Sequence, residues 1–304
     1  MKPHQLSRHM WLRVRFLHSI NYCLEPDMNT PVIDFHIHLV QYEPPSESLM
    51  TLMHTTFSSK EAYEAFEATY SNPAAFVEMV KANGLDYGVI LAEDAPMTTG
   101  MASCEQVAAF CCGREELIPF CTINPFSTPN PVAVLKELCT NLGFKGLKLY
   151  PTYNHFYPNE SRMYPVYAAA QELGIPVLFH TGSSVFNNSR IKYGNPIFFD
   201  DVAVDFPDLK VVMAHGGRGA WYDEAMTMVR LHKNVYIDVT GLPVRKLPHY
   251  FPEIDRFSDK FVFGTDWPQV VIQDSIAKFS QIDLSDASRE KILGGNAAKL
   301  LGIA

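Results

Sequence analysis

Short apolar, β-branched runs alternate along the chain with longer stretches of helical periodicity. Eight runs of strand character are bounded by turn residues, at 32–39, 87–92, 117–123, 144–150, 176–180, 209–215, 235–239 and 260–266. Four helices are predicted between them, over 72–84, 130–142, 163–173 and 221–232; the first two start at Asn-Pro, and a glycine stops the third. Each connection is long enough to return the next strand in parallel, so the pattern predicts a parallel α/β fold.

Two architectures satisfy this alternation, a closed barrel and an open doubly wound sheet. The first strand is not followed by the Gly-x-Gly-x-x-Gly turn that is typical of many doubly wound sheets. The count of eight strands favours a closed (β/α)8 TIM barrel. Two connections are unusually long, 40–72 and 181–195. Both follow a strand, so they are predicted to lie at the carboxyl face, as lid or substrate loops.

Length, composition and charge narrow the class of protein. The 304 residues fit one barrel, which typically needs about 250 residues. The hydrophobic fraction of 47% is that of a globular protein with a sizeable core. A net charge of -8 argues against nucleic-acid binding, which requires a basic face. No apolar run approaches the roughly 20 residues of a membrane helix, so we expect a soluble protein without a membrane partner.

The N-terminal segment and the cysteines bear on location. Three arginines interrupt the apolar stretch within residues 1–27, so no secretory core forms there. We expect 1–27 to be an extension with little structure, and 28–304 to form a single barrel domain; a transit peptide stays open. The six cysteines form no Cys-x-x-Cys pair, which is typical of buried thiols in a reducing compartment. We therefore expect a cytoplasmic protein.

Two histidines, His36 and His38, stand two residues apart in the first predicted strand. The period of two sends both imidazoles to one face. Two buried imidazoles need a partner, and a divalent metal is the obvious candidate. The alternative is one locally bonded core histidine beside another that faces solvent. Asp34 is expected deeper on the same face, as a hydrogen-bond acceptor in the core.

Polar residues also stand in or at the end of four later strands, namely Lys148, His180, His215 and Asp266. The carboxyl ends of barrel strands converge on one mouth, so these residues are predicted to be neighbours of His36 and His38. One such residue alone would ordinarily be satisfied by a backbone carbonyl. Their coincidence with the histidine pair predicts a metal site.

Six motifs stand in chain order: DFHIH at 34–38, GFKGLKL at 143–149, His180, AHGG at 214–217, GTDWP at 264–268 and ILGGNA at 292–297. Over residues 31–304 this set resembles the amidohydrolase superfamily, and within it the amidohydrolase-related group of metal-dependent hydrolases and decarboxylases. The resemblance implies that His36, His38, His180 and Asp266 surround one divalent cation, most often zinc. It places His215 beside that cation.

The residue types agree with this chemistry. Three imidazoles and one carboxylate suit zinc, with manganese or iron as alternatives, and leave a position for water. Asp266 would take the proton of that water and pass it to the leaving group, while His215 would stabilise an oxyanion or donate a proton. The alternative makes His215 the fourth ligand and leaves Asp266 outside the ligand set.

Three functions follow, of which the leading one is a metal-dependent hydrolase that uses an activated water on an ester, lactone or amide carbonyl. The alternative is a metal-dependent, non-oxidative decarboxylase of an aromatic or unsaturated carboxylic acid. The third is a barrel without catalytic activity that acts as a binding or scaffold protein. The expected partner is a small-molecule substrate; a homodimer is left open.

Three residues are candidates for binding the substrate. Lys148 has three interpretations: a carboxylated lysine that bridges two metals as in binuclear relatives, a partner of a substrate carboxylate or of a metal-site acid, or a structural ion pair. We favour one metal. Arg218 follows two glycines and is placed to bind a carboxylate, although a solvated arginine fits as well. Tyr153, in the aromatic segment 151–159, would line a pocket for a flat substrate or pack beneath the loop.

Overall fold

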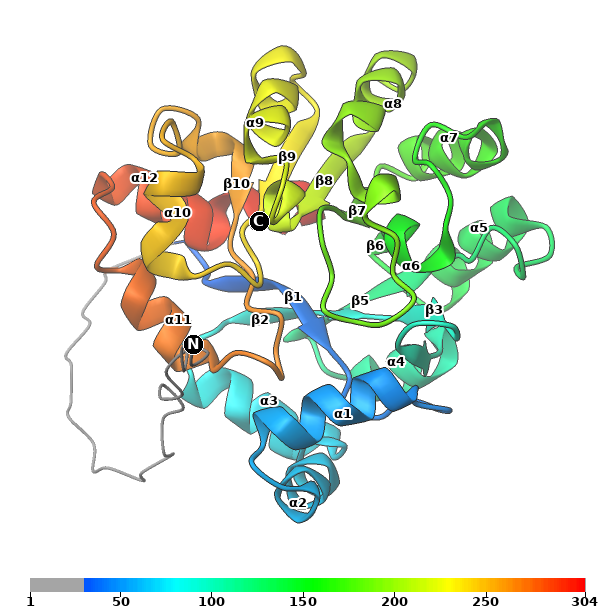
Figure 1. Ribbon diagram of the computed structural model, residues 1–304, viewed down its shortest axis with the longest axis vertical. Helices are drawn as coiled ribbons and strands as arrows, with labels where there is room; N and C mark the ends of the chain where they lie inside the picture. The colour runs from blue at the N-terminus through cyan, green and yellow to red at the C-terminus, as the bar shows by residue number, and fades with distance from the viewer. Residues whose placement is uncertain (1–29, 304) are drawn as a thin grey trace, which may run out of the picture.

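The computed structural model describes residues 30–303 (Figure 1). The predicted extension over 1–27 and its boundary at residue 28 lie outside the described residues. Eight strands, all paired in parallel, form one sheet. In sheet order they are β1 (Ile33–His38), β2 (Tyr87–Leu91), β5 (Leu117–Thr122), β6 (Gly146–Leu149), β7 (Pro176–His180), β8 (Lys210–Ala214), β9 (Val235–Asp238) and β10 (Phe261–Val262).

The sheet closes on itself between β1 and the segment that follows β10. The backbone N–H of Phe35 donates to Phe263 at 2.9 Å, and that of His38 donates to Trp267 at 2.9 Å. The N–H of Asp266 donates back to the carbonyl of His36 at 3.0 Å. The barrel predicted from eight apolar runs is therefore confirmed, and these bonds bring the GTDWP segment against the histidine pair.

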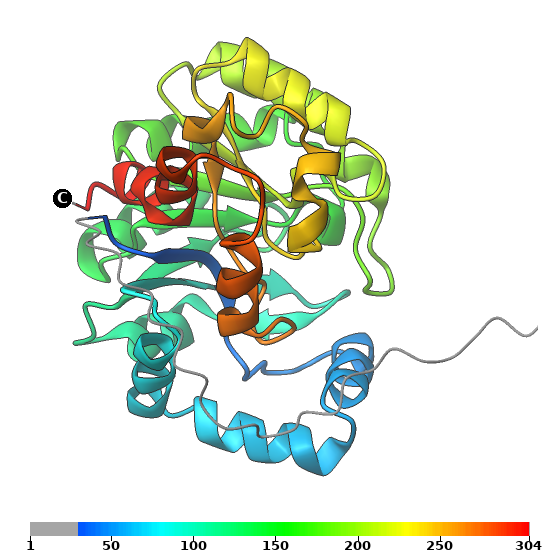
Figure 2. The same ribbon diagram turned by 90° about the vertical axis from the view of Figure 1, so that its left-hand side faces the viewer.

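Helices surround the strands (Figures 1 and 2). They are α1 (Glu47–Thr56), α2 (Lys60–Tyr70), α3 (Pro73–Ala82), α4 (Cys104–Cys111), α5 (Pro131–Asn141), α6 (Pro151–Asn154), α7 (Tyr164–Glu172), α8 (Phe199–Asp205), α9 (Tyr222–Leu231), α10 (Leu247–Tyr250), α11 (Ile272–Phe279), α12 (Asp286–Glu290) and α13 (Asn296–Leu301). The four predicted helices correspond to α3, α5, α7 and α9. Within the described residues, none of the helices combines the length and apolar character needed to span a bilayer.

Apolar side chains from six strands meet in one inner cluster that includes Ile33, Phe35, Val89, Phe120, Leu178 and Val212. Strands on opposite sides of a closed sheet can share such a cluster only inside the barrel. The rings of Phe35 and Phe120 pack edge to face there, with centroids 5.4 Å apart. A second, larger cluster lies between the strands and the helices. The residues at the strand ends therefore lie directly above a tightly packed apolar cluster.

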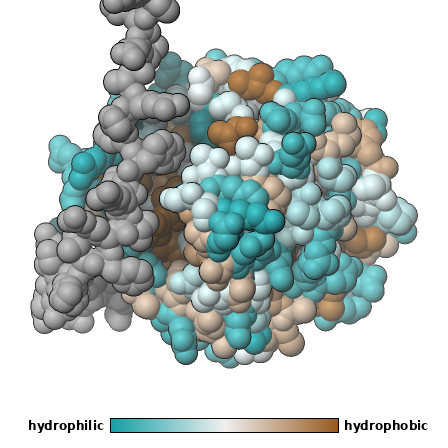
Figure 3. Space-filling model, turned by 60° about the horizontal axis from the view of Figure 1, so that its bottom comes forward, coloured by the Kyte–Doolittle hydropathy of each residue, from teal (hydrophilic) through white to brown (hydrophobic). Residues whose placement is uncertain are grey.

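The two long connections differ in structure. Residues 40–72 contain α1 and α2. The face of the molecule shown in Figure 3 mixes hydrophilic and hydrophobic residues. Leu49 and Met53 of α1 and Tyr63 of α2 are buried in a small cluster of their own. Residues 181–195 have little regular structure apart from a short turn of 3-10 helix. A short antiparallel hairpin that the sequence pattern did not predict, β3 (Glu93–Ala95) with β4 (Gly100–Ala102), follows β2.

Candidate metal centre

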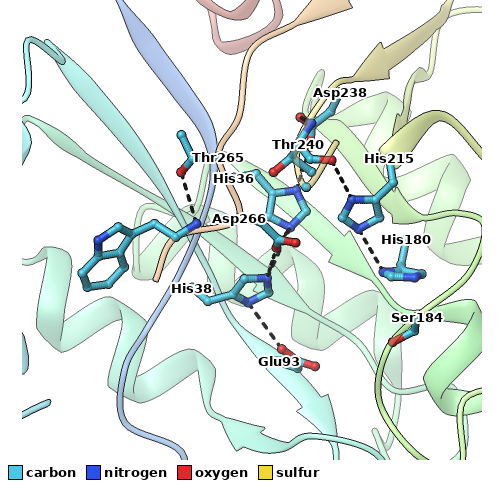
Figure 4. Close-up of polar contacts among 12 residues, drawn as sticks. His36, His38, Glu93, His180, Ser184, His215, Asp238, Thr240, Thr265 and Asp266 are labelled. Carbon is cyan, nitrogen blue, oxygen red and sulfur yellow. Dashed lines mark hydrogen bonds and ion pairs between the residues drawn. The ribbon is translucent and has the colours of Figure 1, made fainter. Parts of the chain in front are cut away.

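Three predicted ligands meet at the mouth of the barrel. His36 and His38 reach it from β1, and Asp266 reaches it from the closing segment after β10 (Figure 4). The Nε2 atoms of the two histidines are 3.3 Å apart. Oδ1 of Asp266 lies 3.5 Å from the first and 3.3 Å from the second. These three residues form a group of candidate metal-binding atoms within 4.8 Å of one another.

A bulge in β1 helps to aim the two histidines. Asp34 pairs with Gly88 and Ile37 pairs with Ile90, so a step of three residues on β1 matches a step of two on β2. As a result Phe35 belongs to the inner apolar cluster, whereas Ile37 belongs to the outer one. His36 and His38 share a face as predicted, but the bulge separates them from Asp34. The expectation that Asp34 shares that face assumed an unbroken period of two.

Asp34 is a buried hydrogen-bond acceptor, as predicted. Its carboxylate accepts from the backbone N–H of Thr265 at 3.0 Å and from the hydroxyl of Thr265 at 2.6 Å. It also accepts from the backbone N–H of His36 at 3.0 Å. Burial raises the pKa of Asp34 to about 7, against the effect of these bonds. Asp34 therefore ties the segment that carries Asp266 to the strand that carries the histidines.

Two acids fix the tautomers of the histidine pair. Nδ1 of His36 lies 2.7 Å from Oδ2 of Asp238, at the end of β9. Nδ1 of His38 lies 3.4 Å from Oε2 of Glu93, at the start of β3. A carboxylate accepts from an N–H, so each Nδ1 carries the proton and each Nε2 keeps its lone pair.

The close approach of the two Nε2 atoms and the Asp266 carboxylate requires a positive charge nearby. Two Nε2 lone pairs and a carboxylate oxygen face one another at 3.3–3.5 Å, which is repulsive unless a cation or a proton lies between them. Burial disfavours the charged form of His38, yet its contacts with Asp266 and Glu93 outweigh burial and raise its pKa to about 9. A bound divalent metal would supply the same positive charge, so these three donor atoms fit the predicted ion.

His180 lies in the same pocket but outside this group of three. Nδ1 of His215 lies 3.0 Å from the carbonyl of Thr240, and Nε2 of His215 lies 3.2 Å from Nδ1 of His180. The carbonyl can only accept, so the protons sit on both Nδ1 atoms and Nε2 of His180 keeps a lone pair. That buried Nε2 atom has no hydrogen-bond partner among the described residues. Its free lone pair suits a fourth ligand.

His215 and Asp266 have unusual backbone conformations, with φ of 64° and 70°. Non-glycine residues adopt this left-handed region rarely, at a cost of about 1–3 kcal/mol each, and such residues cluster at functional sites. Gly241, with φ of 63°, provides the adjoining space. A Cβ atom there would stand 2.8 Å from Oδ2 of Asp266 and 2.8 Å from the Arg218 guanidinium.

Lys148 is completely buried in β6 and lines the same pocket. Its Nζ atom has no hydrogen-bond partner among the described residues, and lies 5.0 Å from the ring centroid of Tyr150. The structural ion pair that was one interpretation of Lys148 therefore does not form in the described part of the chain. Burial lowers the pKa of Lys148 to about 8, against the attraction of Asp238 and Asp266.

The other two predicted substrate contacts also line this pocket. The guanidinium of Arg218 donates twice to the carbonyl of Ser183, at 2.9 and 3.2 Å, and once to that of Gly241 at 3.5 Å. Two of its five N–H groups stay free for another partner. The ring of Tyr153 stacks on Tyr150, with centroids 5.5 Å apart, and the hydroxyl of Tyr153 accepts a hydrogen bond from that of Ser184 at 3.1 Å.

Sequence reasoning missed Asp238 and Glu93. Both follow an apolar strand, at the end of β9 and just after β2. The signal that singled out Asp266, an acid at the end of an apolar strand, would have found them too. Tyr42 and Thr99 complete the surroundings of Glu93 by donating hydroxyl hydrogen bonds to its carboxylate, the former at 2.7 Å.

The barrel and its mouth define the class of protein: a (β/α)8 enzyme with a site for a divalent metal built from histidines and acids. The family model described as amidohydrolase matches residues 33–303. The chain belongs to the amidohydrolase family, as its motifs predicted.

Two curated relatives are γ-resorcylate decarboxylases. That of Polaromonas sp. strain JS666 is 28% identical over 173 residues, which is 47% of this chain and 47% of the relative. That of Rhodococcus jostii strain RHA1 is 26% identical over 230 residues, 58% of this chain and 68% of the relative. The aligned region thus spans about half of one relative and two thirds of the other. Both relatives are named as decarboxylases, the reaction that the sequence analysis gave as the alternative to hydrolysis.

Solved structures share the fold. An uncharacterised TIM-barrel protein of Bordetella bronchiseptica has a TM-score of 0.73 at 24% identity, over 90% of this chain and 98% of its own. A dihydroxybenzoic acid decarboxylase of Polaromonas sp. JS666 has a TM-score of 0.67 at 15% identity, over 90% of this chain and 97% of its own. The latter was solved with manganese and the inhibitor 2-nitroresorcinol.

Proposed function

We propose that this chain is a metal-dependent carboxy-lyase that removes CO2 from a hydroxylated aromatic carboxylic acid. The observation that carries the proposal is the set of converging acceptor atoms of His36, His38 and Asp266, which lies in one pocket with two cationic side chains, Lys148 and Arg218. An anionic substrate needs those cations. The names of the two curated relatives support the same reaction.

His36, His38 and Asp266 would hold one divalent metal, with His180 as the fourth ligand. When bound, the ion would act as a Lewis acid toward the oxygen atoms of the substrate. We propose manganese as the first candidate, because a structural neighbour was solved with it, and zinc, which we expected first, as the second. Imidazole and carboxylate donors accept both metals.

The side chains of this chain would bind the acid from three sides. The Lys148 ammonium is buried and has no hydrogen-bond partner within residues 30–303, so a carboxylate would satisfy it. The free N–H groups of Arg218 would hold a second oxygen group, and the ring of Tyr153 would pack on a flat substrate. These contacts would fix the carboxylate in place before its bond to the ring breaks.

Asp266 would carry the proton. Burial raises its pKa, but the hydrogen bond to His38 and the charges of His38 and Arg218 outweigh burial and lower it. As a carboxylate, Asp266 would take a proton from the substrate hydroxyl and return it to the ring carbon that bears the carboxylate. The bond between the ring carbon and the carboxylate then breaks and CO2 leaves. The electron pair of that bond stays with the ring and restores its aromaticity, which gives a phenolate that water protonates. His215, which the sequence offered as an alternative proton donor, has its N–H bonded to the carbonyl of Thr240 and its Nε2 accepting from His180, so we propose no proton transfer from it.

The test compares the two reactions on one preparation. Protein loaded with manganese or zinc is assayed on hydroxybenzoates for released CO2 and for the decarboxylated phenol, and on lactones and esters for acid release. We expect CO2 and phenol in equal amounts from at least one hydroxybenzoate. Hydrolysis of a lactone or ester without any decarboxylation would favour the metal-dependent hydrolase instead.

A further inference from the structure

The pocket at the barrel mouth is too small for an aromatic acid as it stands. Its volume is about 50 Å³. A cavity of about 150 Å³ takes up benzene, and ligand pockets commonly measure about 300–1,000 Å³. If the proposed function holds, part of the pocket wall must therefore move when the substrate binds.

Part of the wall is fixed, because it consists of residues at strand ends that lie on the packed inner core. The rest comes from α1 and the connection before it, from α6, from the segment after β10, and from the loop after β7, which contributes Val185 and Phe186. Backbone hydrogen bonds hold the two ends of this loop, from Ser183 to Arg218 at 2.8 Å and from Arg190 to Thr152 at 2.9 Å. Between these ends, no backbone-to-backbone hydrogen bond joins residues 184–189 to the rest of the described chain.

Side chains alone hold this segment, which we term the strap (residues 184–189), in place. The hydroxyl of Ser48 on α1 accepts from the N–H of Asn187 at 2.9 Å. The amide of Asn188 donates to the carbonyl of Met97 at 3.0 Å. The Nε2–H of His155 donates to the carbonyl of Asn188 at 2.7 Å, and the hydroxyl of Ser184 donates to that of Tyr153 at 3.1 Å. Three of these four bonds are exposed to solvent, so water can replace them at little cost, and only the bond to Tyr153 is partly buried. The strap can therefore open at lower free energy than the strands beneath it.

Phe186 is the part of the strap that enters the pocket. Its half-buried ring packs edge to face on Tyr153, with centroids 6.0 Å apart, and this links it to the Tyr150 and Tyr153 cluster. The same ring contacts the separate cluster of Leu49, Met53 and Tyr63 on α1 and α2. Phe186 thus bridges the cluster of Tyr150 and Tyr153 and the cluster on α1 and α2.

We propose that Phe186 sets the size of the acid that the site accepts. The strap moves outward to admit a monocyclic hydroxy acid, and from this outer position the ring of Phe186 packs on the substrate, whereas a bicyclic acid leaves no room for that contact. The inference rests on the proposed function and goes beyond it, because it names a residue that selects by ring number.

The experiment measures binding without turnover. Isothermal titration of the manganese-loaded full chain compares 2-nitroresorcinol, which has one ring, with 1-nitro-2-naphthol, which has two. We expect the unaltered protein to bind the first at least about tenfold more tightly, and Phe186→Ala to raise the affinity for the second about tenfold. Phe186→Leu keeps an apolar contact with the α1 and α2 cluster and should give an intermediate ratio.

Phe126→Ala is the matched control, because Phe126 is an exposed phenylalanine that does not line the pocket. It should leave the ratio of affinities unchanged. Equal ratios for the unaltered protein, Phe186→Ala and Phe186→Leu would overturn the role of Phe186 while leaving the proposed function intact. If neither compound binds to the unaltered protein or to any variant, the proposed function fails and this inference fails with it.

Discussion

Each candidate histidine ligand has one ring nitrogen occupied by a defined partner. Asp238 holds His36, Glu93 holds His38, and His215 accepts from His180. In each case the remaining nitrogen is Nε2, which keeps its lone pair. Partners of this kind orient a ligand and increase its basicity.

We expect Asp238→Asn to weaken metal binding about 10–100-fold. The amide oxygen of the asparagine can still accept from His36, but it lacks the negative charge that makes the His36 ring more basic. Competition with a chelator measures the affinity. Asp259→Asn, an exposed acid outside the pocket, serves as control and should bind metal normally. Equal affinities in the two variants would show that Asp238 does not support the metal site.

Lys148 should give the binding of an acid substrate a defined pH dependence. Burial lowers its pKa to about 8, so the ammonium is present below that pH and is lost above it. KM should therefore rise up to about tenfold per pH unit above pH 8.

Lys148→Met should raise KM and remove this inflection. Lys145→Met, which alters an exposed lysine of the same segment, should preserve it. A KM profile that stays unchanged in Lys148→Met would rule out Lys148 as the anion partner.

Among the elements, the strands were predictable because short apolar runs bounded by turn residues are a local signal. All eight strands, and the helices α3, α5, α7 and α9, match predicted segments, although β10 is shorter than its apolar run. The bulge in β1 was not predictable from the pattern, because it depends on the register with β2. The hairpin that carries Glu93 and the strap that carries Phe186 depend on long-range contacts, which a local pattern does not contain.

Gly241 offers a prediction about the loop after β9. A methyl group there would collide with Asp266 and Arg218, and the φ of 63° adds strain. Gly174 has a similar φ of 67° but nothing near its added Cβ. We expect the φ strain to cost each alanine variant about 1–2 kcal/mol of unfolding free energy in denaturant titrations, and the collision to make the loss larger for Gly241→Ala.

Only Gly241→Ala should also lose metal affinity and turnover. Normal metal binding by Gly241→Ala would mean that the contact with Asp266 does not matter for the site.

Over the whole molecule, the candidate ligands come from distant parts of the sequence. β1 supplies two, β7 supplies His180, and the segment after β10 supplies Asp266. A metal bound to them would connect the first strand to the last, so its binding energy adds to the stability of the closed barrel. Sequence motifs in a fixed order indicated this convergence; the separation of His180 from the other three required the structure.

Metal should therefore raise the melting temperature. At a free metal concentration of about 100 times Kd, the gain is about 2.7 kcal/mol, which corresponds to a shift of several degrees for a chain of this length. Differential scanning calorimetry with manganese and with a chelator measures it. His36→Ala/His38→Ala should show no shift, and a shift equal to that of the unaltered protein would place the ion elsewhere.

The metal content of the purified chain tests the central claim most directly, because every proposed role depends on that ion. Elemental analysis should find about one divalent ion per chain. That ion should be removed by chelator, restored by manganese or zinc, and absent from His36→Ala/His38→Ala. A chain that carries no divalent metal, takes up none on reconstitution, and keeps full stability in chelator would contradict the account.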